Sequence, residues 1–223
     1  KAQVGKAIQE LYKSTLKFNA IGGNDYKDKT LFNNQLETVK SELKETIKAL
    51  EDNDLGELVD GSLDLAVTIS FLIAIIDGND SITKNAPLYL NPEDLTAEEL
   101  VPIIAQCIDT ENYIDALGYV EDLIYQVNGD AVANSMSVAE SNLSKYILAE
   151  ELDKSGYSEF DICEAVNEKG RYEDVYSEVT TYNDEEWVVF KSKKDLQNNE
   201  VYPKGKIIKC ILTFKEPSLV VYA

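Results

Sequence analysis

The sequence predicts a mainly α-helical protein with a small strand-containing extension at its C-terminal end. Apolar residues recur at helical spacing up to about residue 150. Segments rich in Val, Tyr and Thr, which favour strands, follow beyond about residue 157. With 223 residues, 44% of them hydrophobic, the chain has enough apolar surface for a folded core. We expect a helical domain over residues 1–150 and an extension with a short β-hairpin or sheet over residues 151–223.

The first two helices are predicted from stripes of apolar residues. Residues 4–18 form one amphipathic stripe, which the glycines at 22 and 23 end. A second helix is expected over about residues 31–52, because apolar residues recur at steps of three and four from Leu36 to Leu50.

A third helix is expected over about residues 55–76. Asp54, followed three residues later by Glu57, is typical of a helix start, where side chains satisfy free backbone N–H groups. From Leu63 to Ile76 the segment is apolar on nearly all sides, so we expect this helix to be central and buried. Turn-forming residues then predict a loop over residues 77–92.

Further helices are expected between this loop and the strands. Asn91-Pro92-Glu93 is typical of a helix start, because proline is favoured in the first turn. The apolar residues from Ile114 to Val127 mark the next helix, and residues 130–149 also have a helical pattern.

Three strands are expected in the C-terminal extension. Val175–Tyr182 and Glu186–Lys191 flank Asn183-Asp184, a pair that is typical of a hairpin turn. Lys206–Phe214 is the third expected strand, because it is rich in β-branched residues.

The net charge restricts the classes of function. Forty-one Asp and Glu against 21 Lys and Arg give a net charge of −20. This excess repels nucleic-acid phosphates, so we expect no nucleic-acid-binding surface. The chain has no histidine, which excludes Ser-His-Asp and Cys-His catalysis and any His-ligated zinc site. Acid–base chemistry must then use carboxylates, lysines or tyrosines.

The cysteines and the apolar segments indicate a soluble protein. Cys107, Cys163 and Cys210 lie far apart and form no CxxC pair, which fits a reducing cytosol rather than a disulfide framework. The longest apolar segment, Leu65–Ile76, is too short to span a bilayer, and the first residues lack the apolar region of a signal peptide. We expect a cytoplasmic protein with no membrane partner.

Four acidic residues on the second and third predicted helices form the most informative pattern. Glu42 and Glu45 are three apart and Asp60 and Asp64 are four apart, so each pair shares one helix face. The short link predicts an antiparallel helical hairpin. In such a hairpin, facing positions have a nearly constant sum of residue numbers, and the pairs 42 with 64 and 45 with 60 meet this condition. If the two faces turn toward each other, the four carboxylates converge.

Converging carboxylates repel one another unless they are protonated or hold a cation. Asp64 is the sharpest case, because it precedes an apolar run in which a bare carboxylate is costly to bury. Oxygen ligands without His or Cys suit Mg²⁺, or Mn²⁺, and Mg²⁺ completes its shell with water and substrate phosphate. The pattern therefore predicts a magnesium–phosphate site. The plainer interpretations are a solvated helix face for Glu42 and Glu45, and a paired or first-turn acid for Asp64.

The same residues resemble a known family. The segment NQLETVKSELKETIKALEDNDLGELVDGSLDLAVTI is similar to the core helix pair of the MazG-like, all-α nucleoside-triphosphate pyrophosphohydrolases. SNLSKY, Ser141–Tyr146, resembles a further segment of that family, and KGRYEDV, WVVFKSKKD and YPKGKIIK are similar to its C-terminal parts. The resemblance is closest to phage-borne proteins of the phosphoribosyl-ATP-pyrophosphohydrolase-like branch.

The resemblance implies a helical bundle, assembly as a homodimer or homotetramer, and Mg²⁺-dependent release of pyrophosphate from nucleotides. By the match, the metal ligands are Glu42, Glu45, Asp60 and Asp64. The chain departs from the family in two places. Gly61 stands where the family often has Glu, so Asp60 would take that role. Residues 78–128 are long beside compact relatives.

We therefore expect an enzyme that cleaves a (deoxy)nucleoside triphosphate between its α- and β-phosphates, giving the monophosphate and pyrophosphate. Since there is no histidine, Glu45 is our candidate for the catalytic base. Gln35, Asn142 and Lys145 are candidate substrate contacts. For these three, the alternatives are an ordinary helix face and a polar helix terminus.

Two other classes of protein fit the sequence. A non-catalytic acidic protein could bind and sequester a nucleotide, or mimic nucleic acid with its surface charge. A purely structural helical adaptor is the third possibility. Nucleotide turnover, nucleotide binding without turnover, and no nucleotide binding separate these classes.

Overall fold

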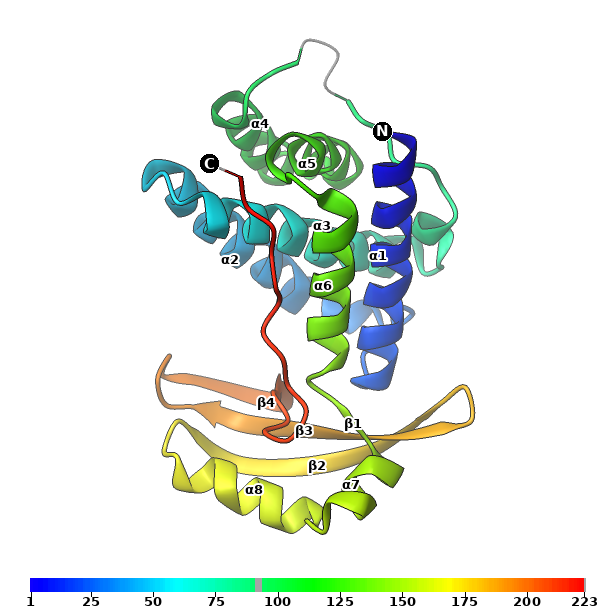
Figure 1. Ribbon diagram of the computed structural model, residues 1–223, viewed down its shortest axis with the longest axis vertical. Coiled ribbons are helices and arrows are strands. Elements are labelled where there is room, and N and C mark those ends of the chain that lie inside the picture. Colours follow the sequence, from blue (N-terminus) through cyan, green and yellow to red (C-terminus); the bar gives the residue numbers. More distant parts are fainter. Residues whose placement is uncertain (91–93, 223) are drawn as a thin grey trace. The chain divides into compact units, whose positions relative to one another are not determined.

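The computed structural model describes residues 1–90 and 94–222, in which the chain is mainly helical with a small antiparallel sheet near the C-terminal end (Figure 1). It divides into two compact units. Unit 1 contains Lys1–Lys17, Asp25–Ala139 and Pro217–Ala223, and unit 2 contains Phe18–Asn24 and Glu140–Glu216. This division differs from the predicted boundary at residue 150. Unit 2 includes the segment from Glu140 onward and also Phe18–Asn24, whereas Pro217–Ala223 belongs to unit 1.

Unit 1 is built from helices, and helices α1 and α6 continue from it into unit 2. The helices are α1 (Ala2–Ile21), α2 (Phe32–Glu51), α3 (Leu55–Asp77), α4 (Ala97–Asp109), α5 (Tyr113–Val127) and α6 (Ala131–Leu143). Single 3₁₀ turns lie at Lys29–Leu31 and Ser81–Thr83. The helices predicted over 4–18, 31–52 and 55–76, and the one marked by Ile114 to Val127, are confirmed within a few residues.

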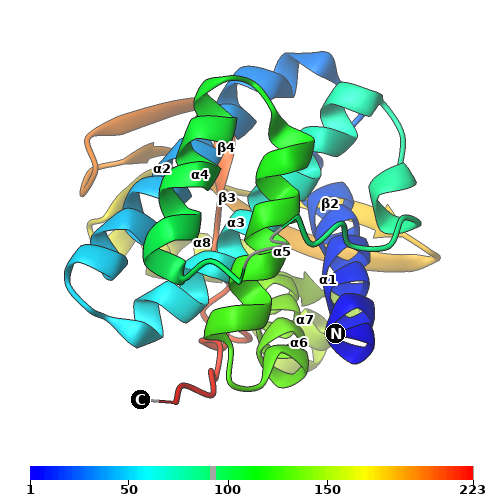
Figure 2. The same ribbon diagram turned by 90° about the horizontal axis from the view of Figure 1, so that it is seen from above.

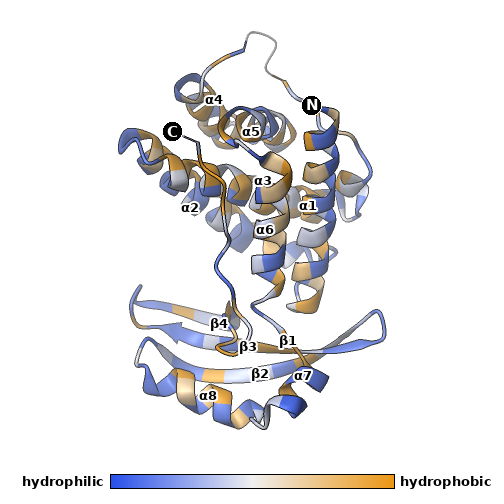
Figure 3. Cartoon of the chain, in the orientation of Figure 1, coloured by the Kyte–Doolittle hydropathy of each residue, from blue (hydrophilic) through white to orange (hydrophobic). Residues whose placement is uncertain are grey.

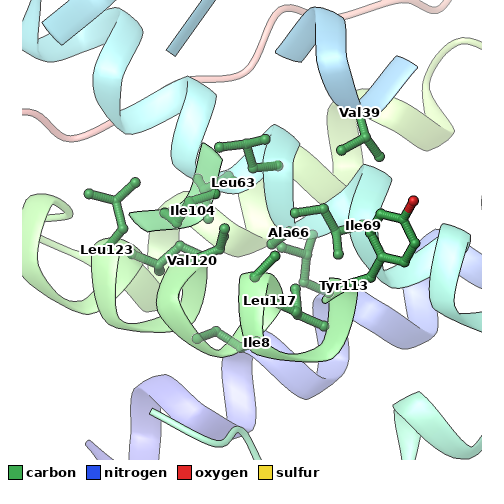
Figure 4. Close-up of a cluster of buried hydrophobic side chains, with 14 of the residues drawn as sticks. Ile8, Val39, Leu63, Ala66, Ile69, Ile104, Tyr113, Leu117, Val120 and Leu123 are labelled. Carbon is green, nitrogen blue, oxygen red and sulfur yellow. The ribbon is translucent and has the colours of Figure 1, made fainter. Parts of the chain in front are cut away.

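Helix α3 is the centre of the unit 1 core, as predicted. Figure 4 shows side chains from α1, α2, α3, α4 and α5 that point toward one another, and Figure 2 shows α4 beside α5. By length and composition α3 could cross a membrane, but 78% of its most apolar window is buried inside the protein. Its apolar character is that of a core helix.

The boundaries of α3 and α4 follow from capping. The Asp54 carboxylate accepts a hydrogen bond from Glu57 N at 3.1 Å, so the predicted helix start is confirmed. The start predicted at 91–93 lies outside the described residues. Helix α4 begins at Ala97, after Thr96, whose backbone N–H donates to the Glu99 carboxylate at 3.2 Å.

The last residues of the chain lie along α6 in unit 1 (Figure 1). Asn134, which is fully buried, accepts from Val220 N at 2.7 Å and donates to Val220 O at 3.0 Å. Ser218 N donates to the Ser137 hydroxyl at 2.7 Å. We call residues 217–222 the C-terminal strap.

Unit 2 contains a sheet with β3 at its centre. Strand β3 (Glu185–Asp195) pairs antiparallel with β2 (Tyr172–Tyr182) on one side, and with β1 (Ile147–Leu148) and β4 (Glu200–Ile208) on the other. The predicted hairpin turn at Asn183-Asp184 is confirmed, and both residues have positive φ (47° and 63°), as a tight hairpin requires. The tip of this hairpin is hydrophilic (Figure 3).

Two predictions in this part of the chain are wrong. The helix predicted over 130–149 ends at Leu143, because Ile147 and Leu148 pair with β3. The strand predicted over Lys206–Phe214 is β4, Glu200–Ile208, because beyond it Cys210 N donates to Lys145 O and Phe214 N donates to Cys210 O. These backbone groups close a turn and leave the sheet.

Two helices of unit 2, α7 (Ala149–Ser155) and α8 (Glu159–Glu168), were not expected from the sequence. Their apolar residues are too few to form a stripe. They pack on one face of the sheet, where Val188 and Phe190 of β3 meet Leu152 and Ile162. Val189 of β3 points to the other face and joins a second cluster.

Asp195, at the end of β3, joins three segments of unit 2. Its buried carboxylate accepts from Arg171 Nη2 at 3.2 Å, from Lys206 Nζ at 3.2 Å and from Gln197 N at 3.1 Å. Asn198 donates to it through its side chain at 3.0 Å. Arg171 first, and Lys206 as well, lower the pKa of Asp195 to about 2. The carboxylate therefore fixes the turn between β3 and β4 in its charged form.

We expect Asp195→Ala to lower the free energy of unfolding by about 3 kcal/mol, because it removes a buried hydrogen-bonded charge and leaves its donors unpaired. Urea denaturation measures this change. Glu216→Ala is the control: its carboxylate is 77% exposed and 3.7 Å from Lys209, so we expect a change within about 0.5 kcal/mol. Equal effects of the two variants would contradict this role of Asp195.

Glu121 on α5 is a buried carboxylate of unit 1, at 2% exposure. Its Oε2 accepts from the Tyr12 hydroxyl at 2.9 Å and its Oε1 accepts from Leu88 N at 2.9 Å. Burial raises the pKa of Glu121 to about 7, with a smaller contribution from Asp122, whereas the hydrogen bonds from Leu88 and Tyr12 oppose the shift. Glu121 thus links α1, α5 and the segment before α4.

The raised pKa of Glu121 predicts that stability falls as the pH rises. Between the ordinary pKa of 4.5 and the folded-state pKa of about 7, the folded chain keeps a proton that the unfolded chain has lost. We expect the free energy of unfolding to drop by up to about 3 kcal/mol across this window. Urea denaturation from pH 4.5 to 8 tests this, with Glu121→Gln as reference. A constant difference between the two proteins across the window would contradict the prediction.

Candidate functional site

The predicted acidic residues lie on the hairpin of α2 and α3, which are joined by Asp52–Asp54. The two helices approach each other closely at Gly61. A Cβ atom at Gly61 would lie only 2.5 Å from Thr46 Oγ1 and 3.5 Å from Thr46 Cα. A side chain at this position would meet Thr46, which favours glycine here.

A second contact joins the same helices further from the turn. The side-chain nitrogen Nε2 of Gln35 donates to Thr68 O at 2.8 Å. Gln35 is half-buried and Thr68 is buried. The contact ties the N-terminal part of α2 to the middle of α3 and, with Gly61, it defines the register of the hairpin.

Glu42 and Asp64 are bracketed by these two contacts. On α2, Glu42 lies four residues before Thr46 and seven after Gln35, so all three share one face. On α3, Asp64 lies three residues after Gly61 and four before Thr68, again on one face. The register thus brings Glu42 and Asp64 to the same level of the hairpin, as their residue numbers predict.

Glu45 and Asp60 lie on the same side of the hairpin as that pair. Each precedes a residue of the close contact, Thr46 or Gly61, and one residue turns a helix by about 100°. Because the helices are antiparallel, these two turns point to one side of the hairpin rather than to opposite sides. The other side carries core residues, among them Leu36, Leu43, Leu65 and Ile69.

The two buried threonines near the acids are satisfied within their own helices. Thr46 Oγ1 donates to Glu42 O and Thr68 Oγ1 donates to Asp64 O, both at 2.8 Å. Each hydroxyl therefore bonds to the carbonyl of the acidic residue four positions earlier. Glu42, Asp60 and Asp64 are half-buried and Glu45 is exposed.

The donor chemistry of these residues suits a hard divalent cation. They offer carboxylate oxygens alone, which Mg²⁺ and Mn²⁺ accept. Across residues 1–90 and 94–222, no group of three or more His, Cys, Asp or Glu side chains is placed so that it could hold a metal ion. The four acids therefore form two pairs, spaced i,i+3 on α2 and i,i+4 on α3, and not the single converging group that the sequence predicted.

The three predicted substrate contacts have separate positions. Gln35 uses its side-chain N–H in the contact with Thr68. Asn142 and Lys145 belong to unit 2, at the end of α6 and just beyond it, whereas the four acids belong to unit 1. Lys145 Nζ lies 5.4 Å from the centre of the Phe18 ring, a cation–π contact, and Lys145 N donates to Asn142 O at 3.2 Å.

Sequence reasoning missed the residues that set the register of the site. Thr46, Gly61 and Thr68 each make or limit a contact between α2 and α3. The usable signal was Gly61 itself, because a glycine in the interior of a helix often marks a close approach of another backbone. Glu121 and Tyr12 were also missed, since nothing local relates residues 109 positions apart.

Comparison with protein-family models, with curated proteins and with solved structures found no match.

The close contact at Gly61 predicts a strong coupling between two substitutions. We expect Gly61→Ala to destabilise the chain by about 1–3 kcal/mol, because the new methyl group meets Thr46. In a Thr46→Ala background the hydroxyl is gone and the nearest atom is the Cβ of residue 46 at 3.3 Å, so the same change should cost at least about 1 kcal/mol less, helped by the higher helix propensity of alanine. Urea denaturation of the four proteins measures the coupling. Additive effects would contradict the register described above.

Proposed function

We propose that the protein is a Mg²⁺-dependent nucleotide pyrophosphohydrolase that converts a (deoxy)nucleoside triphosphate to the monophosphate and pyrophosphate. One observation carries the proposal. The contacts at Gly61 and Gln35 define a hairpin register, and this register supports a site in which Glu42 is level with Asp64 and Glu45 and Asp60 face the same side. The resemblance of this helix pair to MazG-like pyrophosphohydrolases supports the same activity.

The metal ligands in this proposal are Glu42, Glu45, Asp60 and Asp64, and the ion is Mg²⁺, with Mn²⁺ as an alternative. A bound divalent ion would neutralise phosphate charge and make water a better nucleophile. Half-buried acids suit this role, because a cation offsets the cost of holding carboxylates together away from water.

Glu45 is the proposed general base, because it is exposed and lies one turn from Glu42. In this step Glu45 accepts a proton from water while the water oxygen bonds to the α-phosphorus. The bond from that phosphorus to the oxygen bridging the β-phosphate breaks, and its electron pair leaves with pyrophosphate. A carboxylate fits this role in a chain that has no histidine.

The substrate contacts remain part of the proposal. Gln35 would contact the nucleotide through its amide oxygen, since its N–H is used. Asn142 and Lys145 would contact the base or the phosphates. We also propose a cytoplasmic homodimer or homotetramer that binds neither nucleic acid nor membrane, on the basis of the net charge and the resemblance.

Pyrophosphate release from a panel of nucleoside triphosphates, with and without Mg²⁺, tests the activity. We expect turnover to require the metal and Asp64→Asn to lower kcat/KM by at least about 100-fold, since a metal ion supplies several kcal/mol of transition-state stabilisation. Glu37→Gln is the matched control, because Glu37 is an exposed acid on the same helix. We expect it to retain full activity.

The alternatives give different results in the same experiments. Nucleotide binding by calorimetry without turnover would favour a sequestering protein, and turnover that Asp64→Asn leaves unchanged would contradict the metal-ligand assignment. Absence of any nucleotide binding would exclude both the enzyme and the sequestering protein.

A further inference from the structure

A small cavity lies in unit 1, away from the four acids of the hairpin. Its volume is about 110 Å³. Helices α1, α3 and α5 and the segment between α3 and α4 surround it. Its lining includes Tyr12, Ile73, Asp77, Leu88, Ile114, Leu117 and Glu121.

The base of the cavity is polar and buried. The Glu121 side chain and Tyr12 are 2% and 1% exposed, and both line the cavity. The carboxylate accepts hydrogen bonds from the Tyr12 hydroxyl and from Leu88 N, both at 2.9 Å, and the backbone N–H of Tyr89 is a further donor to it. A carboxylate has about four acceptor positions and a phenol oxygen keeps lone pairs when it donates. The base therefore presents acceptors to whatever enters.

Apolar side chains form much of the cavity wall and part of its mouth, where the polar residues Asp77, Ser81 and Asn85 also lie. Ile73 and Leu117 are buried wall residues. Leu88 and Ile114, which also line the cavity, are 52% and 56% exposed. Large apolar side chains exposed beside a cavity are a typical feature of a ligand-binding mouth.

The charges around the cavity have one sign. Its acidic residues are Glu121 at the base and Asp77 at the rim, and none of the described lining residues is Lys or Arg. Asp122, which does not line the cavity, is close enough to Glu121 to interact with it electrostatically. A cation in the cavity would thus meet the negative charge of Glu121 at the base and of Asp77 at the rim.

We propose that this cavity binds a small primary ammonium ion with a short apolar chain. The ammonium group has three N–H donors for the acceptors of Glu121 and Tyr12, and its charge offsets the desolvation of the Glu121 carboxylate. The alkyl chain of the ligand packs against the apolar wall residues and extends toward Leu88 and Ile114. A volume of about 110 Å³ is smaller than the ~150 Å³ that holds benzene, which limits the chain to about four or five carbons.

The state of Glu121 makes this binding depend on pH. Because burial raises the pKa of Glu121 to about 7, the free protein carries a charged carboxylate above this pH and a neutral one well below it. An ammonium ion favours the charged form. Binding should therefore weaken as the pH falls below 7, by roughly tenfold for each pH unit, while a neutral ligand of the same shape should be unaffected.

The test compares n-butylammonium with 1-butanol, which has nearly the same shape and no charge. Methyl NMR titration of the full-length protein follows Ile73, Ile114 and Leu117 up to about 50 mM ligand, well above the millimolar Kd expected for so small a molecule. We expect n-butylammonium to bind at least tenfold more tightly than 1-butanol at about pH 8, and this preference to disappear at about pH 5.5.

Two variants make the assignment specific. Glu121→Gln should abolish the preference for the ammonium ion, whereas Asp77→Asn, at the exposed rim, should weaken binding by less than about threefold. If Glu121→Gln does not fold, Ile114→Trp serves instead. Residue 114 is 56% exposed, so the larger ring covers the mouth without altering the core, and both ligands should bind at least about fivefold more weakly.

Three results would overturn the proposal. They are equal affinities for n-butylammonium and 1-butanol at about pH 8, methyl shifts that Ile114→Trp leaves unchanged, and no shift of the lining methyls at the highest concentration. None of these results bears on pyrophosphate release, because the cavity and the acids of the hairpin are separate groups of residues.

Discussion

The close approach of α2 and α3 at Gly61 is the contact on which the candidate site depends. With no side chain at this position, the helix backbones come near enough for Thr46 to pack against Gly61, and the hydrogen bond from Gln35 to Thr68 then fixes the rotation of both helices. A bulkier residue would separate the helices or rotate one of them. The relative positions of acids spaced along the two helices follow from this one steric constraint.

The chain combines two environments for carboxylates that serve different ends. Asp195 is surrounded by an arginine, a lysine and backbone N–H groups, so it stays charged and holds a turn. Glu121 has only neutral donors, so its carboxylate gains and loses its proton near neutral pH. In a protein without histidine, this buried glutamate occupies the range of pKa in which histidine usually works. The strongly acidic composition thus includes groups with quite different chemistry.

Sequence reasoning succeeded where local patterns decide the structure. The helical hairpin, its capping residue Asp54 and the turn at Asn183-Asp184 all depend on residues a few positions apart. It failed where distant partners decide. Residues 130–149 have a helical pattern, but pairing with β3 takes Ile147 and Leu148 into a strand. The acids at the candidate site could be proposed from sequence because, in an antiparallel helical hairpin, residue numbers predict which positions lie side by side. No such rule relates the residue numbers of Glu121 and Tyr12, whose side chains form a hydrogen bond.

The C-terminal strap has a consequence for biosynthesis. Unit 2 is encoded almost entirely between Ala139 and Pro217, so the strap that bonds to Asn134 leaves the ribosome after unit 2 has been made. Until the strap is synthesised, Asn134 therefore lacks its final backbone partners. The polar groups around it, which are buried in the complete fold, stay hydrated or loosely packed until then. Completion of the helical unit thus follows the synthesis of unit 2, in contrast to the usual order in which the N-terminal part of a chain folds first.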